Sequence, residues 1–151
     1  IIENDINLPN LEKVEIQTFR NTKIKNVISL GKITAIPNNM FEGCSLMEHC
    51  TLPYTLTTIG VYCFNAINLQ ELDIPAGVTS IGTGAFIGGQ SLKYIICRPT
   101  TPPTLGGNNF GSVLGTCVFY VPDESLSAYQ AATNWNVFAS KMKGISELPT
   151  T

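Results

Sequence analysis

The sequence predicts an α/β solenoid, in which each repeat contributes one short strand and either a second strand or a short helical turn. Residues 69–86 read LxxLxIPxxVxxIGxxxF, and the same pattern occurs on both sides of this segment. Equivalent positions are separated by 22 or 23 residues. A period of this length is typical of proteins whose repeats stack side by side.

Three regular units align between residues 33 and 99, and too many positions agree for a chance match. The aligned columns are Ile36, Ile59 and Ile81; Phe41, Phe64 and Phe86; and Cys50, Leu72 and Ile95. No single unit of this size can bury its own apolar face. We therefore expect each column to form a ladder in a shared core.

Each unit contains the alternation of a half-buried strand. Leu72 and Ile74 alternate with Glu71 and Asp73, which places the two apolar side chains on one face. Pro75 should end this strand, because proline has no amide hydrogen to donate.

The rest of each unit should return along the other side of a coil. Residues 78–82 (VTSIG) predict a second short extended segment, where Gly82 permits a turn. Residues 83–89 (TGAFIGG) predict one turn of α-helix or 3₁₀-helix, too short to be stable alone.

We predict a single domain over residues 1–151 in three parts. Irregular N-terminal repeats occupy residues 1–32, regular repeats occupy residues 33–99, and a terminal strand with a capping helix occupies residues 100–151. A chain of 151 residues is long enough for one continuous core.

The N-terminal part departs from the regular spacing. Leu11, Val14 and Ile16 carry the strand pattern, but they begin only 13 residues before Ile24, where the pattern starts again. We therefore expect the first unit to be shortened or irregular.

The repeat pattern is lost after Pro99. Residues 100–112 (TTPPTLGGNNFGS) predict a loop that can neither pair as a strand nor continue a helix. A last strand is expected at residues 117–122 (CVFYVP), and Asp123 is a good N-cap for a helix after it. That helix should break near Asn134.

Three aromatic residues lie at helical spacing in this last segment. Tyr129, Trp135 and Phe138 should share one apolar face, and we expect this face to cover the end of the stack. The alternative is an aromatic patch that binds a sugar or a protein partner, which would leave Trp135 exposed to water.

Composition limits the classes of function. The net charge is −2 and only 13% of residues are charged, which does not fit the basic stripe of a nucleic-acid-binding protein. No apolar run approaches the 18 residues of a membrane span. The first residues, IIENDINLP, show neither an initiator methionine nor a basic apolar leader. We therefore expect the chain to be either a processed product or a piece cut from a longer protein, with any export signal already removed.

The five cysteines do not follow a disulfide or metal-site pattern. Their number is odd, no CxxC pair occurs, and the chain has a single histidine. We expect free thiols that pack as small apolar groups, with only Cys44 near the surface. No metal and no other cofactor is predicted.

Two motifs resemble a known family. The IGxxxF motif at residues 59–64 and 81–86, together with LxxLxIP at residues 69–75, resembles the BspA-type leucine-rich repeat of bacterial surface proteins. The ending TPPTLGGNNF followed by VFYVPDESLSAYQAATNW is similar to the C-terminal cap of such proteins from Bacteroides-type bacteria. The resemblance covers residues 24–148.

The resemblance implies a right-handed leucine-rich-repeat solenoid and export to the cell surface or periplasm. It also implies a role in adhesion or protein binding, with host extracellular-matrix proteins as one class of partner. The matching residues are all core or turn residues, so the resemblance carries no functional residue over to this chain.

The outward strand residues should form two columns on one broad face. The first is Lys13, Asn26, His49, Glu71 and Tyr94, and the second is Glu15, Ile28, Thr51, Asp73 and Ile96. An aromatic anchor among polar neighbours suits a protein partner. Our candidate partner-binding residues are His49, Thr51, Glu71, Asp73, Tyr94 and Ile96.

A catalytic interpretation of this face is weaker. Glu71 and Asp73 could act as general acid and base, with His49 one coil away, but an open face has nothing to exclude water or to raise a carboxylate pKa. No nucleophile elbow, phosphate loop or zinc signature is present. We therefore predict that the chain is not an enzyme.

Two hypotheses for function remain. The first is a secreted or cell-surface binding module that recognises a protein or a glycan. The second is a structural spacer or assembly domain of a larger surface protein, without a ligand of its own.

Overall fold

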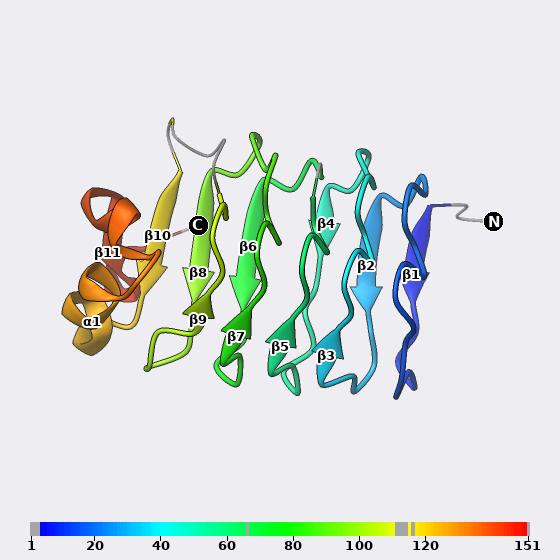
Figure 1. Cartoon of the computed structure of the whole chain (residues 1–151), viewed down its shortest axis with the longest axis horizontal. Helices are drawn as coiled ribbons and strands as arrows, with labels where there is room; N and C mark the ends of the chain where they lie inside the picture. Colours follow the sequence, from blue (N-terminus) through cyan, green and yellow to red (C-terminus); the bar gives the residue numbers. More distant parts are fainter. Residues whose placement is uncertain (1–3, 66, 111–114, 116, 151) are drawn as a thin grey trace.

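The computed structural model describes residues 4–65, 67–110, 115 and 117–150. Its short strands follow one another along a stack of coils, and every strand pair in these residues is parallel (Figure 1). The strands are β1 (Asp5–Asn7), β2 (Asn26–Ser29), β3 (Ala35–Ile36), β4 (His49–Cys50), β5 (Thr58–Ile59), β6 (Glu71–Ile74), β7 (Ser80–Ile81), β8 (Tyr94–Cys97), β9 (Thr104–Leu105), β10 (Val118–Val121) and β11 (Met142–Gly144).

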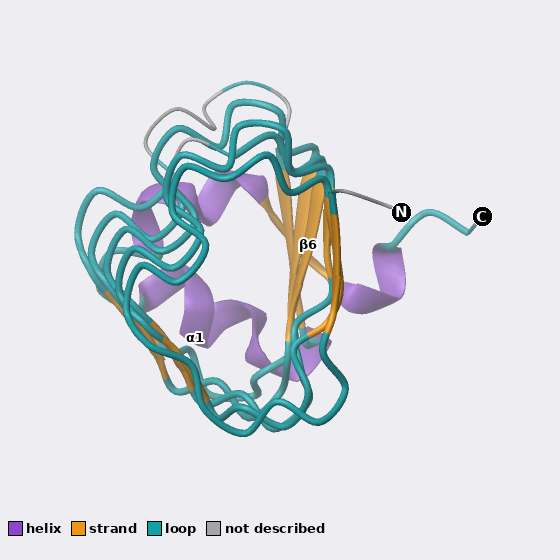
Figure 2. Cartoon of the chain, turned by 90° about the vertical axis from the view of Figure 1, so that its right-hand side faces the viewer, coloured by secondary structure: helices purple, strands orange, loops and turns teal. Residues whose placement is uncertain are grey.

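The strands form two sides of the coils, which Figure 2 shows in a view along the stack. The broad side holds two sheets, with strand orders β1-β2-β4 and β6-β8-β10-β11. The narrow side holds one sheet, β3-β5-β7-β9. The predicted strand at Leu72 and Ile74 and the predicted second segment at Ile81 are both confirmed.

A ladder of phenylalanine rings runs through the core between the two sides. Neighbouring rings are stacked with centroids 5.1 to 5.5 Å apart, and the last four are fully buried. The ladder consists of Phe19, Phe41, Phe64, Phe86 and Phe110. The central three were predicted, and the structure extends the ladder by one ring at each end.

The predicted position of the strand in the N-terminal unit is wrong. Its strand is β1, where Ile6 pairs with Val27, and not the segment at Leu11, Val14 and Ile16. The Phe19 amide donates to the Met40 carbonyl at 3.0 Å, so this coil keeps the ordinary period. The error arose because the apolar i, i+3 spacing occurs in both halves of each unit.

The predicted unpaired loop at residues 100–112 is described as far as residue 110, and this part contradicts the prediction, whereas residues 111 and 112 lie outside the described residues. Thr104 and Leu105 form β9, which pairs with β7. The buried Asn109 side chain accepts from the Phe86 amide at 3.1 Å and donates to the Gly82 carbonyl at 2.8 Å. The equivalent amides of Phe41 and Phe64 donate to backbone carbonyls, so the Asn109 side chain takes the place of a backbone acceptor at this coil.

The predicted helical turn near each ladder phenylalanine is instead a turn in the backbone. The Phe41 amide donates to Cys63 and the Phe64 amide donates to Ala85, each at 2.8 Å, so these bonds join neighbouring coils. Asn39, Tyr62 and Gly84 have φ values of 60°, 52° and 62° at equivalent positions. Glycine meets this requirement with the least strain.

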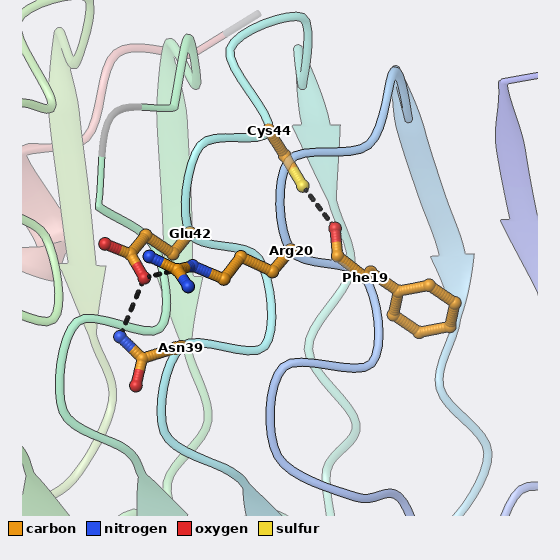
Figure 3. A network of polar contacts seen from close by, with 5 residues as sticks. All are labelled: Phe19, Arg20, Asn39, Glu42 and Cys44. Atoms are coloured by element: carbon orange, nitrogen blue, oxygen red, sulfur yellow. Dashed lines mark hydrogen bonds and ion pairs between the residues drawn. The ribbon is translucent and has the colours of Figure 1, made fainter.

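All five cysteines are unpaired, and four of them are buried. The prediction that Cys44 lies near the surface is wrong, because its thiol is buried and donates to the Phe19 carbonyl at 3.0 Å (Figure 3). Glu42 sits at the same turn edge, where it accepts from Asn39 and pairs with Arg20 at 2.8 Å. Short polar contacts thus join this turn to the coil before it.

The C-terminal segment lies at the β10 end of the stack (Figure 1). It contains helix α1 (Leu126–Ala131) and the 3₁₀-helices η1 (Asp123–Ser125), η2 (Asn136–Lys141) and η3 (Ile145–Glu147). The predicted break after α1 is confirmed, with Asn134 at φ 66°. Asp123 is not an N-cap, because it lies inside η1 and accepts from the Ser146 amide.

Two of the predicted aromatic residues are fully buried in this segment. The Trp135 indole donates to the Pro103 carbonyl and the Tyr129 hydroxyl donates to the Pro99 carbonyl, each at 2.8 Å. Phe138 stacks on Phe119 with centroids 4.9 Å apart. Trp135 is therefore not part of an exposed aromatic patch. Strand β11, which was not expected, pairs with β10.

Candidate binding site on the broad side

The broad side is interrupted between β4 and β6. Among the described residues these two strands form no ladder, although β5 and β7 of the same two coils pair on the narrow side. The phenylalanine ladder also crosses this boundary without a change in spacing. The coils therefore stay in contact through the core while their outer strands separate.

A hollow of about 610 Å³, here called the groove, lies at this interruption. All six residues predicted from the sequence line it. Its lining consists of His49, Thr51, Glu71, Asp73, Tyr94, Ile96, Tyr54, Arg98, Cys50, Leu52, Leu72, Pro75 and Ala76. The groove thus reaches the edge of the core as well as the outward columns.

At Cys50 the core is partly exposed to solvent. Val27, Leu72 and Ile95 occupy the same column and are at most 1% exposed, whereas Cys50 is only partly buried. Burial still raises the pKa of the Cys50 thiol to about 12, with a smaller contribution from Cys44. The thiol is therefore protonated at neutral pH and acts as a small apolar group.

Tyr94 and Glu71 form one fixed polar pair at the groove. The Tyr94 hydroxyl donates to Glu71 Oε2, and this hydrogen bond raises the pKa of the Tyr94 hydroxyl above its ordinary value. The Tyr94 ring also contacts Tyr120 edge to face, with centroids 6.3 Å apart. Tyr94 is thus held from two directions.

Arg98 and Asp73 form the second pair. Arg98 Nε donates to Asp73 Oδ1 at 2.6 Å, and a terminal nitrogen donates to Oδ2 at 2.7 Å. The hydrogen bonds to Asp73 raise the pKa of the guanidinium. This two-point geometry orients both side chains, although about half of each is exposed to solvent.

The sequence prediction missed Tyr54 and Arg98. Tyr54 is 80% exposed and follows Pro53, where the next unit has Ala76 after Pro75. Both missed residues lie just beyond the alternating strand pattern. A signal was available at Arg98, since the third unit departs from the repeat at that position.

The predicted outward columns hold only in part. Asn26, His49 and Tyr94 lie at their expected strand positions, and Ile28 is 50% exposed. The assignment of Lys13 and Glu15 to the heads of the columns is wrong. Asp5 takes the place next to Asn26, and the two side chains are joined by a hydrogen bond of 2.6 Å.

The family described as BspA type Leucine rich repeat region matches residues 3–112, in six copies. The chain belongs to the BspA-type leucine-rich repeat family. Leucine-rich repeats of this type are generally non-catalytic modules for protein interaction, and BspA-type proteins are typically exported or exposed at the cell surface. A comparison with curated proteins found no match.

The match also bears on the N-terminal unit. It begins at residue 3 and so includes the coil whose phase the sequence pattern obscured, and it ends at residue 112, just past Phe110. The family assignment and the ring ladder therefore agree on which residues belong to BspA-type repeats.

Two properties of the described part of the chain concern membranes and metal ions. None of its helices has the length and apolar character needed to cross a membrane. Within the same residues, no three His, Cys, Asp or Glu side chains are grouped so that they could hold a metal ion. In the groove itself, Glu71 accepts a hydrogen bond from Tyr94, and Asp73 accepts two from Arg98.

Proposed function

We propose that this chain is a non-catalytic repeat module, secreted or carried at the cell surface, that binds a protein partner in the groove. One observation carries the proposal: the six outward residues chosen from the sequence line a single hollow, together with an exposed tyrosine and an arginine. Aromatic and arginine side chains are the residue types most enriched among energetic anchors of protein interfaces.

The fixed side chains favour this function over a purely structural face. Tyr94 is held by Glu71 and Tyr120, and Arg98 is held by Asp73. Side chains that are ordered before binding lose less conformational entropy when a partner arrives. A surface that served only as a spacer would need neither the hollow nor this order.

The proposal includes a single right-handed solenoid domain that is closed at one end by residues 123–148. The burial of Tyr129 and Trp135 against the last coil supports the capping role. A cap of this kind keeps the apolar end of a repeat stack out of water.

The test uses two double variants matched in residue type. Tyr54→Ser with Ile96→Ser removes apolar surface from the groove, and Tyr62→Ser with Ile16→Ser removes exposed apolar surface elsewhere. Each protein is applied to a panel of immobilised extracellular-matrix proteins and to a glycan array. We expect the groove variant alone to lose affinity for a matrix protein, by about tenfold or more.

The outcomes separate the alternatives. Equal affinity of both double variants would place the partner outside the groove and contradict the proposal. Binding to glycans alone would favour carbohydrate recognition, and a wild-type protein that binds nothing on either panel would favour the spacer hypothesis. Denaturant unfolding of each variant controls for loss of structure.

A further inference from the structure

We infer that the partner places a basic side chain, a lysine or an arginine, in the groove against Glu71 and beside Tyr54 and Tyr94. This inference rests on the proposed function and specifies the chemistry of the partner. Three features of the groove support it: the hydrogen bonds that its carboxylates already accept, its net charge, and its tyrosine rings.

The two carboxylates of the groove differ in how much bonding capacity they retain. Arg98 occupies both oxygens of Asp73. Glu71 accepts from Tyr94 through Oε2, and its Oε1 has no partner among the described residues. An ionised carboxylate has about four acceptor positions. Of these two carboxylates, Glu71 therefore has more acceptor capacity left for a ligand.

The charge of the groove favours a cation. Its lining contains the two carboxylates of Glu71 and Asp73 and the one guanidinium of Arg98. An acidic ligand would meet Glu71 as a like charge, since the cation of Arg98 is already bound by Asp73. Complementary charge then both attracts a basic partner and rejects an acidic one.

The rings and apolar groups match the rest of a basic side chain. Tyr54 and Tyr94 both line the groove and offer aromatic faces, which attract lysine and arginine cations within about 6 Å of the ring centroid. Ile96, which is partly exposed, and Ala76, which is exposed, line the same hollow. They provide apolar surface for the methylene groups of a long basic side chain.

Peptide titrations of the whole chain followed by NMR test the inference. The probes are three capped pentapeptides with the sequences GGRGG, GGKGG and GGEGG. We expect the two basic peptides to shift groove signals and to bind more tightly than the acidic one. Raising the salt from about 50 mM to about 500 mM should weaken this binding, because exposed charges are then screened.

Three variants should change the affinity for the basic peptides in three different ways. Glu71→Gln keeps an acceptor for Tyr94 but removes the charge, and it should weaken binding of the basic peptides about two- to fivefold. Arg98→Gln frees Asp73 and should strengthen their binding. Glu15→Gln makes the same change in net charge away from the groove and should have no effect.

The inference is overturned if Glu71→Gln binds the basic peptides as tightly as wild type, if Arg98→Gln weakens them, or if no peptide shifts the groove signals. These failures differ from a failure of the proposed function. A matrix protein that is lost by the Tyr54 and Ile96 double variant but retained by Glu71→Gln would leave the groove as the binding site and exclude the basic anchor.

Discussion

The two sides of the coil are built on the same core but differ in continuity. The narrow side pairs β3, β5, β7 and β9 in one sheet, and its outward residues are small: Ala35, Thr58, Ser80 and Thr104. The broad side is divided between β4 and β6, and its outward residues differ from coil to coil. Regular core spacing therefore does not by itself make both sheets continuous.

The length of the unit does not explain the division. His49 to Glu71 on the broad side and Thr58 to Ser80 on the narrow side both span 22 residues, yet only the second pair is joined. The inward position at the division holds Cys50, whose side chain is smaller than those of Val27 and Leu72 in the same column. A smaller side chain fills less of the space beneath the strand, which agrees with the partial exposure of Cys50.

The ring ladder joins the two sides, so its removal should have the largest effect. Phe64→Ala deletes a fully buried ring that stacks on Phe41 and Phe86 at 5.4 and 5.3 Å. We expect a loss of about 3 to 5 kcal/mol in the free energy of unfolding, measured with denaturant. A loss below about 1 kcal/mol would mean that the ladder does not hold the coils together.

Two truncations to alanine, one on each side of the coil, should differ in how much stability they remove. Ile59→Ala, on the continuous narrow side, should destabilise the fold by about 3 to 5 kcal/mol, because Ile59 is buried and its strand is paired on both sides. Leu72→Ala should have a smaller effect, about 2 to 3 kcal/mol, since Leu72 borders the groove and neighbouring groups and water can fill the space. Unfolding in urea measures both, and the reverse order would contradict the opening of the core at the groove.

The smallest expected effect is at the surface of the broad side. Asp73→Asn, Arg98→Gln and the double variant form a cycle whose coupling free energy should be at most about 1 kcal/mol, because about half of each side chain is exposed. The coupling should decrease at high salt. A coupling free energy of several kcal/mol would show that this pair stabilises the divided sheet. Its main role would then be to stabilise the fold, and not to orient side chains in the groove.

The sequence pattern predicted the regular coils well, because their core positions repeat at a fixed spacing. It failed where a different residue does the same structural work. Asn109 bonds to the Phe86 amide and the Gly82 carbonyl and so holds its segment in the stack. A pattern of apolar residues does not show such a bond. It also failed at Leu11 and Val14, where the spacing fits either half of a unit.

The candidate site could be predicted only through the strand alternation. That alternation selected His49, Thr51 and the other four outward residues, which do line one hollow. Tyr54 and Arg98 lie beyond the strand ends, so alternation says nothing about them. Their place at the groove depends on how neighbouring coils turn after each strand.

The sequence by itself determined the repeat period, the ladder of apolar columns and the family, because these depend on which residues recur every 22 or 23 positions. Only the tertiary structure decided that the broad sheet divides at Cys50 and that Glu71 and Asp73 take different partners. The reason is physical: a core column is fixed by spacing along the chain, whereas a groove and its polar pairs depend on side chains from three successive coils that meet only when the coils stack.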